Sequence, residues 1–367
     1  MFEVVEKKSN IKDFKLKHNS LMLRSDGFTQ LLYFTNNNKV KYNKEFIDFG
    51  IWDKNIFFLQ INNRILLNSG ELPYKVLAIN NEHYIHVYHI GDDGYTTILS
   101  ELRDLDKDNN KIFEYNGPFR DELILSNFVI VSTFNPPGLK QSILCTDIFN
   151  QKSKGWSVDL VEIGAFYYGG KAQKADRYHS TGELRRIIGV ANDILWIALT
   201  SGRLLGLLIK SGEIIHNISV PSSYPSNYKL KEEDEYLYFG EYMQLDKSGK
   251  ILFGLRANWY WEIPLNVDHP KDNFILYDIE DTMLLHEMRA SMVGYEWSFD
   301  SDYIYFGDSQ AAKIGVFDRF KREVVWSAQV EVKKEGLGSL KKLEYADGKL
   351  YVLDRTNVLH IYERIES

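Results

Sequence analysis

The property that most constrains this chain is a recurring pattern of strand-like segments. Short apolar or alternating segments recur between turn residues, and helical periodicity is almost absent. Residues 193–199, 203–209 and 213–220 are separated by Thr-Ser-Gly and Lys-Ser-Gly, which predicts three antiparallel strands joined by hairpins. The same rhythm continues through 303–330 and 349–364. The 23 Tyr and 21 Phe residues suit half-buried pleated surfaces, and only 8 Pro interrupt them. We therefore expect an all-β chain.

A finer register links three segments of nine residues, each of which runs from a strand end through a turn to an aromatic ring. The segments are 208–216, 278–286 and 318–326, and a looser copy runs from 147 to 156. The last two rings, at positions 286 and 326, are 40 residues apart, which fits one compact four-stranded propeller blade. The wider spacings of the other rings then include insertions.

The turns at 209–216 and 318–326 are similar to the D-x-x-T-G-x-x-x-W turn of the quinoprotein-like β-propeller repeat. The carboxy-terminal 220 residues or so resemble this PQQ-type or WD-like repeat, and the first 120 share only its strand rhythm. No linker or shift in composition divides the chain, so we expect a single β-propeller domain over residues 1–367. The resemblance implies about seven four-stranded blades, or eight if residues 49–73 form a shortened blade. No cofactor ligand of the family can be placed on this sequence, so we expect no cofactor.

The last blade contains only three candidate strands, at 340–345, 349–354 and 358–364. Residues 2–7 alternate as an outer strand should, and they could supply the fourth strand. We therefore expect the amino- and carboxy-terminal strands to pair and to close the propeller without an exposed edge.

Two clusters imitate metal sites. His83, His86 and His89 fall on an expected strand, where His86 points away from the other two because side chains alternate. The carboxylates of 104–108 resemble the start of a calcium loop, but the required glycine and terminal glutamate are absent. We expect no metal at either place.

Enzyme signatures are equally scarce. Cys145, the only cysteine, lies in an apolar strand, which favours burial over nucleophilic chemistry. The sequence has no G-x-S-x-G elbow, Walker loop, H-E-x-x-H pair, dinucleotide fingerprint or sialidase Asp-box. These observations favour a protein that is not an enzyme, and they assign no catalytic residue.

Charge and terminal composition bear on partners and location. Lys and Arg number 44 and Asp and Glu 51, a net charge of −7, which argues against general affinity for nucleic acid or anionic membranes. The amino terminus has no continuous apolar stretch of the signal-peptide kind, and no segment reaches about 18 apolar residues. We expect a soluble, cytoplasmic, monomeric scaffold.

Three long segments are expected on one face of the propeller, because second-to-third and fourth-to-first connections emerge together. They are 163–183 and 221–235 between blades, and 257–273 within one blade. Long loops on a rigid scaffold usually carry function. The expected partner-binding residues are Lys171, Lys174, Arg177, Tyr178, His179, Glu232, Glu233, Asp234, Glu235, Trp259, Tyr260, Trp261 and Glu262. The alternative for this set is solvated charges together with Trp259 and Trp261 as ordinary strand residues.

Two functions follow from these expectations. The first is a non-enzymatic protein-binding propeller, most specifically a cytoplasmic immunity or antitoxin protein whose acidic loop neutralises a basic, nuclease-like toxin. The second is a carbohydrate-binding or carbohydrate-active propeller, in which Trp259 or Trp261 stacks on a sugar while carboxylates act as acid and base.

Overall fold

The computed structural model shows two compact units, which are described separately below. Unit 1 comprises Met1–Asn116 and Ile279–Ser367, and unit 2 comprises Gly117–Asp278. The structure describes residues 2–17, 19–34, 38–52, 55–60, 62, 65–67, 70–71, 76–80, 84–91, 94–101, 111–116, 119–125, 127–135, 139–147, 155–163, 166–168, 178–180, 182–200, 203–219, 243–256, 258–289, 297–332 and 339–365.

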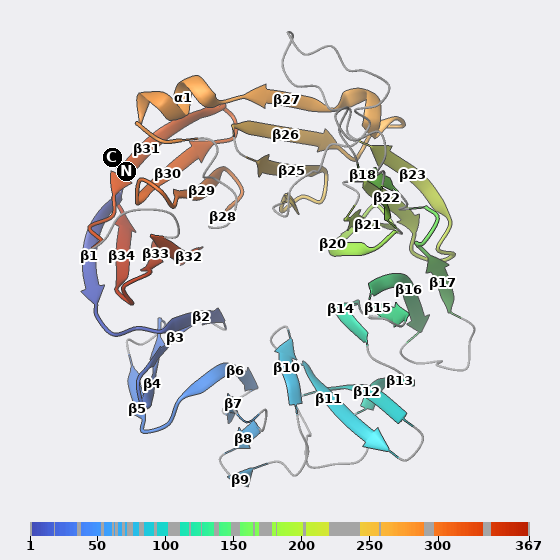
Figure 1. Cartoon of the computed structure of the whole chain (residues 1–367), viewed down its shortest axis with the longest axis horizontal. Helices are drawn as coiled ribbons and strands as arrows, with labels where there is room; N and C mark the ends of the chain where they lie inside the picture. Colours follow the sequence, from blue (N-terminus) through green and yellow to red (C-terminus); the bar gives the residue numbers. More distant parts are fainter. Residues whose placement is uncertain are drawn as a thin grey trace. The chain divides into compact units, whose positions relative to one another are not determined.

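Unit 1 contains five antiparallel four-stranded sheets, which we call blades, and one short helix on the outer strand of one of them (Figure 1). The strands of these blades are β2 (Asp13–Lys17), β3 (Ser20–Ser25), β4 (Phe28–Tyr33) and β5 (Lys39–Tyr42); β6 (Phe46–Trp52), β7 (Asn55–Gln60), β8 (Ile65–Leu67) and β9 (Gly70–Glu71); β10 (Val76–Asn80), β11 (Tyr84–Gly91), β12 (Gly94–Glu101) and β13 (Lys111–Asn116); β28 (Trp297–Phe299), β29 (Tyr303–Asp308), β30 (Lys313–Asp318) and β31 (Glu323–Gln329); and β32 (Leu340–Ala346), β33 (Lys349–Asp354) and β34 (Leu359–Arg364) with β1 (Phe2–Lys8). Helix α1 spans Glu280–Leu285.

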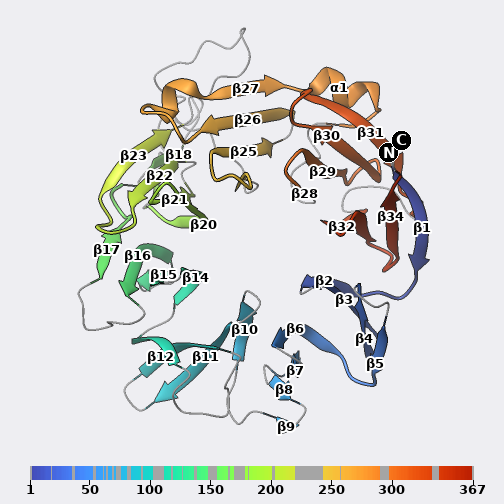
Figure 2. The same ribbon diagram turned by 180° about the vertical axis from the view of Figure 1, so that it is seen from behind.

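Unit 2 contains three further blades and a two-stranded hairpin, which Figure 2 shows from behind. The strands of its blades are β14 (Phe119–Ile124), β15 (Phe128–Asn135), β16 (Leu139–Asp147) and β17 (Trp156–Asp159); β20 (Leu184–Ala191), β21 (Ile194–Leu199), β22 (Arg203–Leu208) and β23 (Ile214–Ser219); and β24 (Met243–Leu245), β25 (Ile251–Arg256), β26 (Trp259–Pro264) and β27 (Ile275–Asp278). The hairpin pairs β18 (Phe166–Tyr168) with β19 (Tyr178–Ser180), and a 3-10 turn, η2, spans Pro270–Asn273.

These sheets confirm the all-β prediction and resolve the number of blades. Over the described ranges, the chain forms eight four-stranded sheets rather than about seven. The additional blade is β6 to β9, which overlaps the segment 49–73 predicted as a shortened blade. It is indeed shortened, because its third and fourth strands have only three and two residues.

The apolar core lies between successive blades of each unit. In unit 2, Ile143 and Cys145 of β16 pack in one cluster with Leu195 of β21 and Leu205 of β22. The middle strands of a blade have apolar partners on both faces, so β21 is buried at five successive positions and reads as a continuous apolar run. The continuous runs in the sequence therefore mark middle strands.

The expected pairing of the chain ends is present. β1 runs antiparallel to β34, with Phe2 opposite Arg364, and it supplies the fourth strand of the last blade. Phe2 is buried, with its ring 5.4 Å from that of Trp326 and 5.9 Å from that of Tyr305. A register shift after Val4 interrupts the alternation of β1.

Removal of residues 1–9 should destabilise the protein and promote self-association. The deletion leaves the edge of β34 unpaired and eliminates the burial of Phe2, which is worth about 1.5–3 kcal/mol. Thermal unfolding and light scattering on a sizing column measure both effects. The matched control replaces the exposed Val4 and Val5 by Ser and should behave as the wild type. A deletion variant with wild-type melting temperature and size would contradict this role of β1.

Cys145 should be chemically inert in the folded protein. Its side chain is buried in β16, and burial, with a smaller contribution from Asp147, raises the pKa of the thiol to about 12. We expect reaction with Ellman's reagent at pH 8 to be at least about tenfold slower in the folded than in the denatured protein. The variant Lys210→Cys, which adds a thiol in an exposed turn, provides the reactive control. Rapid reaction of the folded wild type would show that Cys145 is accessible.

Candidate functional site

Much of the face predicted to bind a partner lies outside the described residues. Tyr178 and His179 belong to β19, where His179 is opposite Tyr167 and Tyr178 is opposite Tyr168. The residues outside the described part of the chain are Lys171, Lys174, Arg177, Glu232, Glu233, Asp234 and Glu235. Partner binding by these residues stays a prediction.

Two of the three long segments connect the elements that the sequence predicted. Residues 163–183 lie between β17, the fourth strand of one blade, and β20, the first strand of the next. The base of this segment is closed by the amide of Gly182, which donates to the carbonyl oxygen of Val161 at 2.8 Å. Residues 221–235 likewise fall between β23 and β24. Both are fourth-to-first connections, as expected.

The third segment, 257–273, is not a long second-to-third connection. Only two residues separate β25 from β26, and Trp259, Tyr260, Trp261 and Glu262 all belong to strand β26. Tyr260 is completely buried and Trp261 is 3% exposed, because β26 lies between β25 and β27. The Tyr260 hydroxyl donates to Glu262. The placement of these aromatic residues therefore agrees with the alternative, in which they are ordinary strand residues. The long connection of this blade lies between β26 and β27.

The structure does not test the two candidate metal clusters. His86 and His89 lie on β11 as predicted, whereas His83 and the carboxylates of 104–108 fall outside the described residues. Among the side chains that the structure places, no three His, Cys, Asp or Glu groups are arranged to hold a metal ion. The described helices likewise include none long and apolar enough to cross a membrane.

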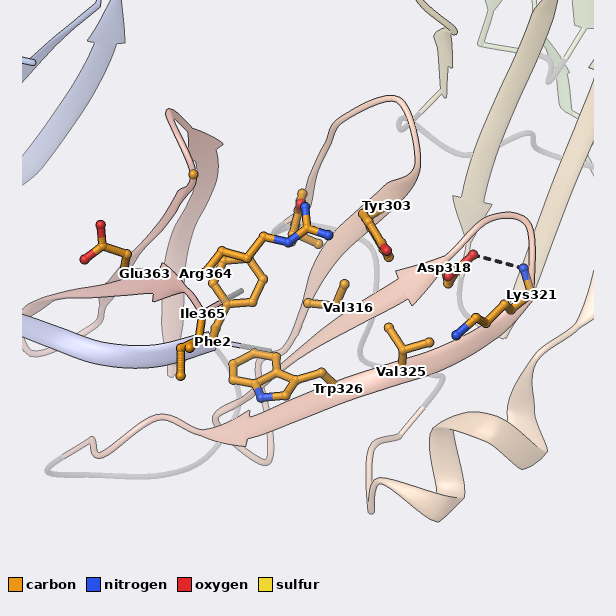
Figure 3. Close-up of a pocket in the computed structure, with 12 residues that line it drawn as sticks. Phe2, Tyr303, Val316, Asp318, Lys321, Val325, Trp326, Glu363, Arg364 and Ile365 are labelled. Carbon is orange, nitrogen blue, oxygen red and sulfur yellow. Dashed lines mark hydrogen bonds between the residues drawn. The ribbon is translucent and has the colours of Figure 1, made fainter. Parts of the chain in front are cut away.

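A cavity of about 860 Å³ in unit 1 is a candidate binding site that the sequence did not predict. It lies between the blade β28 to β31 and the last blade, and Figure 3 shows its lining side chains. We call it the aromatic cleft. Its lining residues are Phe2, Tyr303, Tyr305, Val316, Asp318, Lys321, Val325, Trp326, Gly348, Glu363, Arg364 and Ile365.

Strand ends and turns bring these residues together. Tyr303 begins β29 and Asp318 ends β30, so both lie at the end of the blade where the turn to β31 begins. At the corresponding end of the last blade, Arg364 ends β34 and Phe2 begins β1. The cleft therefore combines the turn end of one blade with the paired chain ends of the next.

The floor of the cleft is a packed aromatic group. The Tyr305 ring stacks on that of Tyr345 with centroids 4.2 Å apart, and the Tyr305 hydroxyl donates to Asp300 at 2.7 Å. Burial first, and then the hydrogen bond to Asp300, raise the pKa of Tyr305, so the hydroxyl stays protonated at neutral pH. Phe2 packs edge-on against Tyr305 and is tilted against Trp326. The floor is thus closely packed and uncharged.

The rim of the cleft combines exposed aliphatic side chains with cationic side chains. Val325 is 37% exposed and Ile365 is 41% exposed, although both are aliphatic. The Arg364 guanidinium lies 4.7 Å from the centre of the Tyr303 ring, a cation–π contact visible in Figure 3. Lys321 is an exposed residue of a turn, and its ammonium group is the second positive charge of the rim. Such an arrangement can hold an apolar group on its floor and an anionic group at its rim.

Only part of this site has a signal in the sequence. Trp326 is the aromatic ring of a repeat segment, and Phe2 was placed on the closing strand. Their contact requires β1 to pair with β34 beside β31, a long-range arrangement that local patterns do not encode.

No protein-family model and no curated protein matches the chain. Solved structures do match along its whole length. BamB from Moraxella catarrhalis is 13% identical, with a TM-score of 0.52, over 99% of this chain and 100% of that one. The β-propeller domain of Cps50 (Swd1) from Myceliophteria thermophila is 12% identical, with a TM-score of 0.53 and 100% of both chains covered. Sqt1 from Saccharomyces cerevisiae is 9% identical, with a TM-score of 0.54, over 100% of this chain and 98% of that one. At these identities the likeness concerns the fold alone, and the fold is that of a β-propeller.

Proposed function

We propose that this β-propeller is a non-enzymatic, cytoplasmic protein-binding scaffold and that the aromatic cleft is one of its binding sites. The observation that carries the proposal is a cavity of about 860 Å³ with an aromatic floor and a partly exposed aliphatic rim. Concave sites of this size, lined by aromatic residues and a few polar groups, are typical of ligand and anchor sites.

The energetics favour an apolar side chain from a partner. A Leu- or Phe-sized side chain that leaves water for such a floor gains about 1.5–3 kcal/mol. Tryptophan and arginine residues at the centre of a contact commonly dominate binding, and Trp326 and Arg364 both line the cleft. Val325 and Ile365 at the rim would add contact area around the inserted group.

A finer proposal concerns the partner and a second surface. An immunity or antitoxin role would use the acidic run 232–235 to bind a basic toxin, and Lys171, Lys174, Arg177, Tyr178 and His179 would be further contact residues. It is supported by the acidic composition of 232–235 and by the net charge of −7.

The carbohydrate alternative has lost part of its support. It required an accessible indole ring at Trp259 or Trp261, and Trp261 is buried within β26 while Trp259 is partly buried. A sugar-stacking surface on this strand is therefore restricted to Trp259.

Site-specific photo-crosslinking tests the scaffold function. The photoreactive residue p-benzoylphenylalanine replaces Val325, and the protein is irradiated in the cells that produce it. We expect a discrete protein adduct, because Val325 borders the cleft and is exposed. The matched control replaces Ile215, which is 40% exposed and lies on β23, the fourth strand of a blade in unit 2.

The outcomes separate the two surfaces. An adduct at Val325 that is absent at Ile215 supports protein binding at the cleft, and identical adducts at both positions would contradict it. A third arm places the photoreactive residue at Glu233. An adduct with a basic protein at that position supports the antitoxin proposal, and its absence counts against that proposal alone.

A further inference from the structure

We infer that the aromatic cleft selects an acidic, apolar segment of a protein partner, in which an aliphatic side chain is flanked by carboxylates. This inference rests on the proposed scaffold function and specifies the chemistry of the segment bound. It differs from the basic partner proposed for the acidic run, because the two surfaces carry different charges.

The acidic side chains that line the cleft are already engaged. Asp318 is only 7% exposed, and its Oδ1 accepts hydrogen bonds from the amides of Phe320 and Lys321, each at 2.9 Å. Glu363 lies 3.6 Å from the ammonium group of Lys349. Both carboxylates therefore already have donors on this chain, whereas the cations of the cleft have no carboxylate partner among the described residues.

The cationic side chains that line the cleft remain available. Lys321 is exposed at the turn between β30 and β31, and Arg364 lies over the ring of Tyr303. Within the part of the chain that the structure describes, neither side chain forms an ion pair with a carboxylate. A carboxylate brought to this rim would therefore find the ammonium group of Lys321 without a carboxylate partner in the described structure. Beside it lies the Arg364 guanidinium, which contacts the aromatic side chains of Tyr303 and Tyr345.

The net charge of −7 does not oppose this local preference strongly. At physiological ionic strength, interactions between exposed charges fade beyond about 8 Å. Lys321 and Arg364 line the cleft itself, so they act on a bound group at shorter range than most of the chain's carboxylates.

The rings of the cleft favour an aliphatic side chain over a flat nucleotide base. Tyr303 has the Arg364 guanidinium over its ring, and Trp326 packs against Phe2. Each of these two rings is therefore already in contact with another side chain of the protein and offers less surface for a stacked base. Val325 and Ile365 extend the apolar surface beyond the floor. A peptide segment with more than one apolar side chain needs such additional apolar surface.

Fluorescence anisotropy with three synthetic peptides tests the inference on the full-length protein. Each labelled nonapeptide has a central Leu-Leu pair, and the flanks are Asp and Glu, Asn and Gln, or Lys and Arg. We expect the acidic peptide to bind most tightly, and its advantage over the neutral peptide to shrink as salt is raised. ATP serves as the nucleotide competitor and should not displace it.

The variant Lys321→Gln isolates the charge. Because this side chain is exposed and has no ion pair in the described structure, the folded state should be unaffected. We expect affinity for the acidic peptide to fall about two- to fivefold, as for one exposed ion pair, and affinity for the neutral peptide to stay the same. Arg364→Gln should act in the same direction. The matched control is Lys210→Gln, an exposed lysine at the equivalent turn between β22 and β23 of unit 2.

Several results of these binding experiments would overturn the inference. Equal binding of all three peptides, tighter binding of the basic peptide, or no binding of any peptide would overturn the inference. Displacement of the acidic peptide by ATP would indicate a nucleotide site and overturn it as well. An equal loss of affinity in Lys321→Gln and Lys210→Gln would also refute it. The adduct at Val325 tests protein binding separately, and a crosslinked segment without acidic residues would leave the scaffold function standing.

Discussion

Burial of apolar surface between neighbouring blades is the interaction on which this structure depends. A single four-stranded sheet with both faces apolar cannot be stable in water alone, and within each unit a blade covers the face of its neighbour. In unit 1, Leu353 of β33 packs in one cluster with Phe14 of β2 and Leu21 of β3. In unit 2, Trp196 of β21 packs with Trp261 of β26 in the same way. The buried aromatic side chains of the described residues contribute to this packing.

The aromatic cleft occurs where this packing between blades opens to solvent. Tyr305 and Phe2 belong to the same apolar cluster as Val316, and all three also line the cavity. The site thus needs no separate architecture, because its floor is the edge of the core. Its selectivity comes from a few rim residues whose replacement leaves the core intact. A propeller can therefore change its ligand at such a place without a change of fold.

The local parts of this structure could be predicted from the sequence, and the long-range parts could not. The hairpins expected over 193–220 correspond to β21, β22 and β23, since alternation and turn residues act within a few positions. The segment 257–273 was misassigned because its aromatic residues resemble binding anchors, although they belong to β26. The cleft left no local signal, because Phe2 and Arg364 meet only through the pairing of β1 with β34.

That pairing also has a consequence for the time course of synthesis. β1 leaves the ribosome long before its partner β34, so it must wait unpaired while the strands between them are made. Its exposed charges, including Glu3 and Glu6, suit this interval because they discourage association with other nascent chains. The cavity wall formed by Phe2 and Arg364 is completed only when translation has passed β34. A partner that needs both side chains therefore does not bind copies truncated before β34.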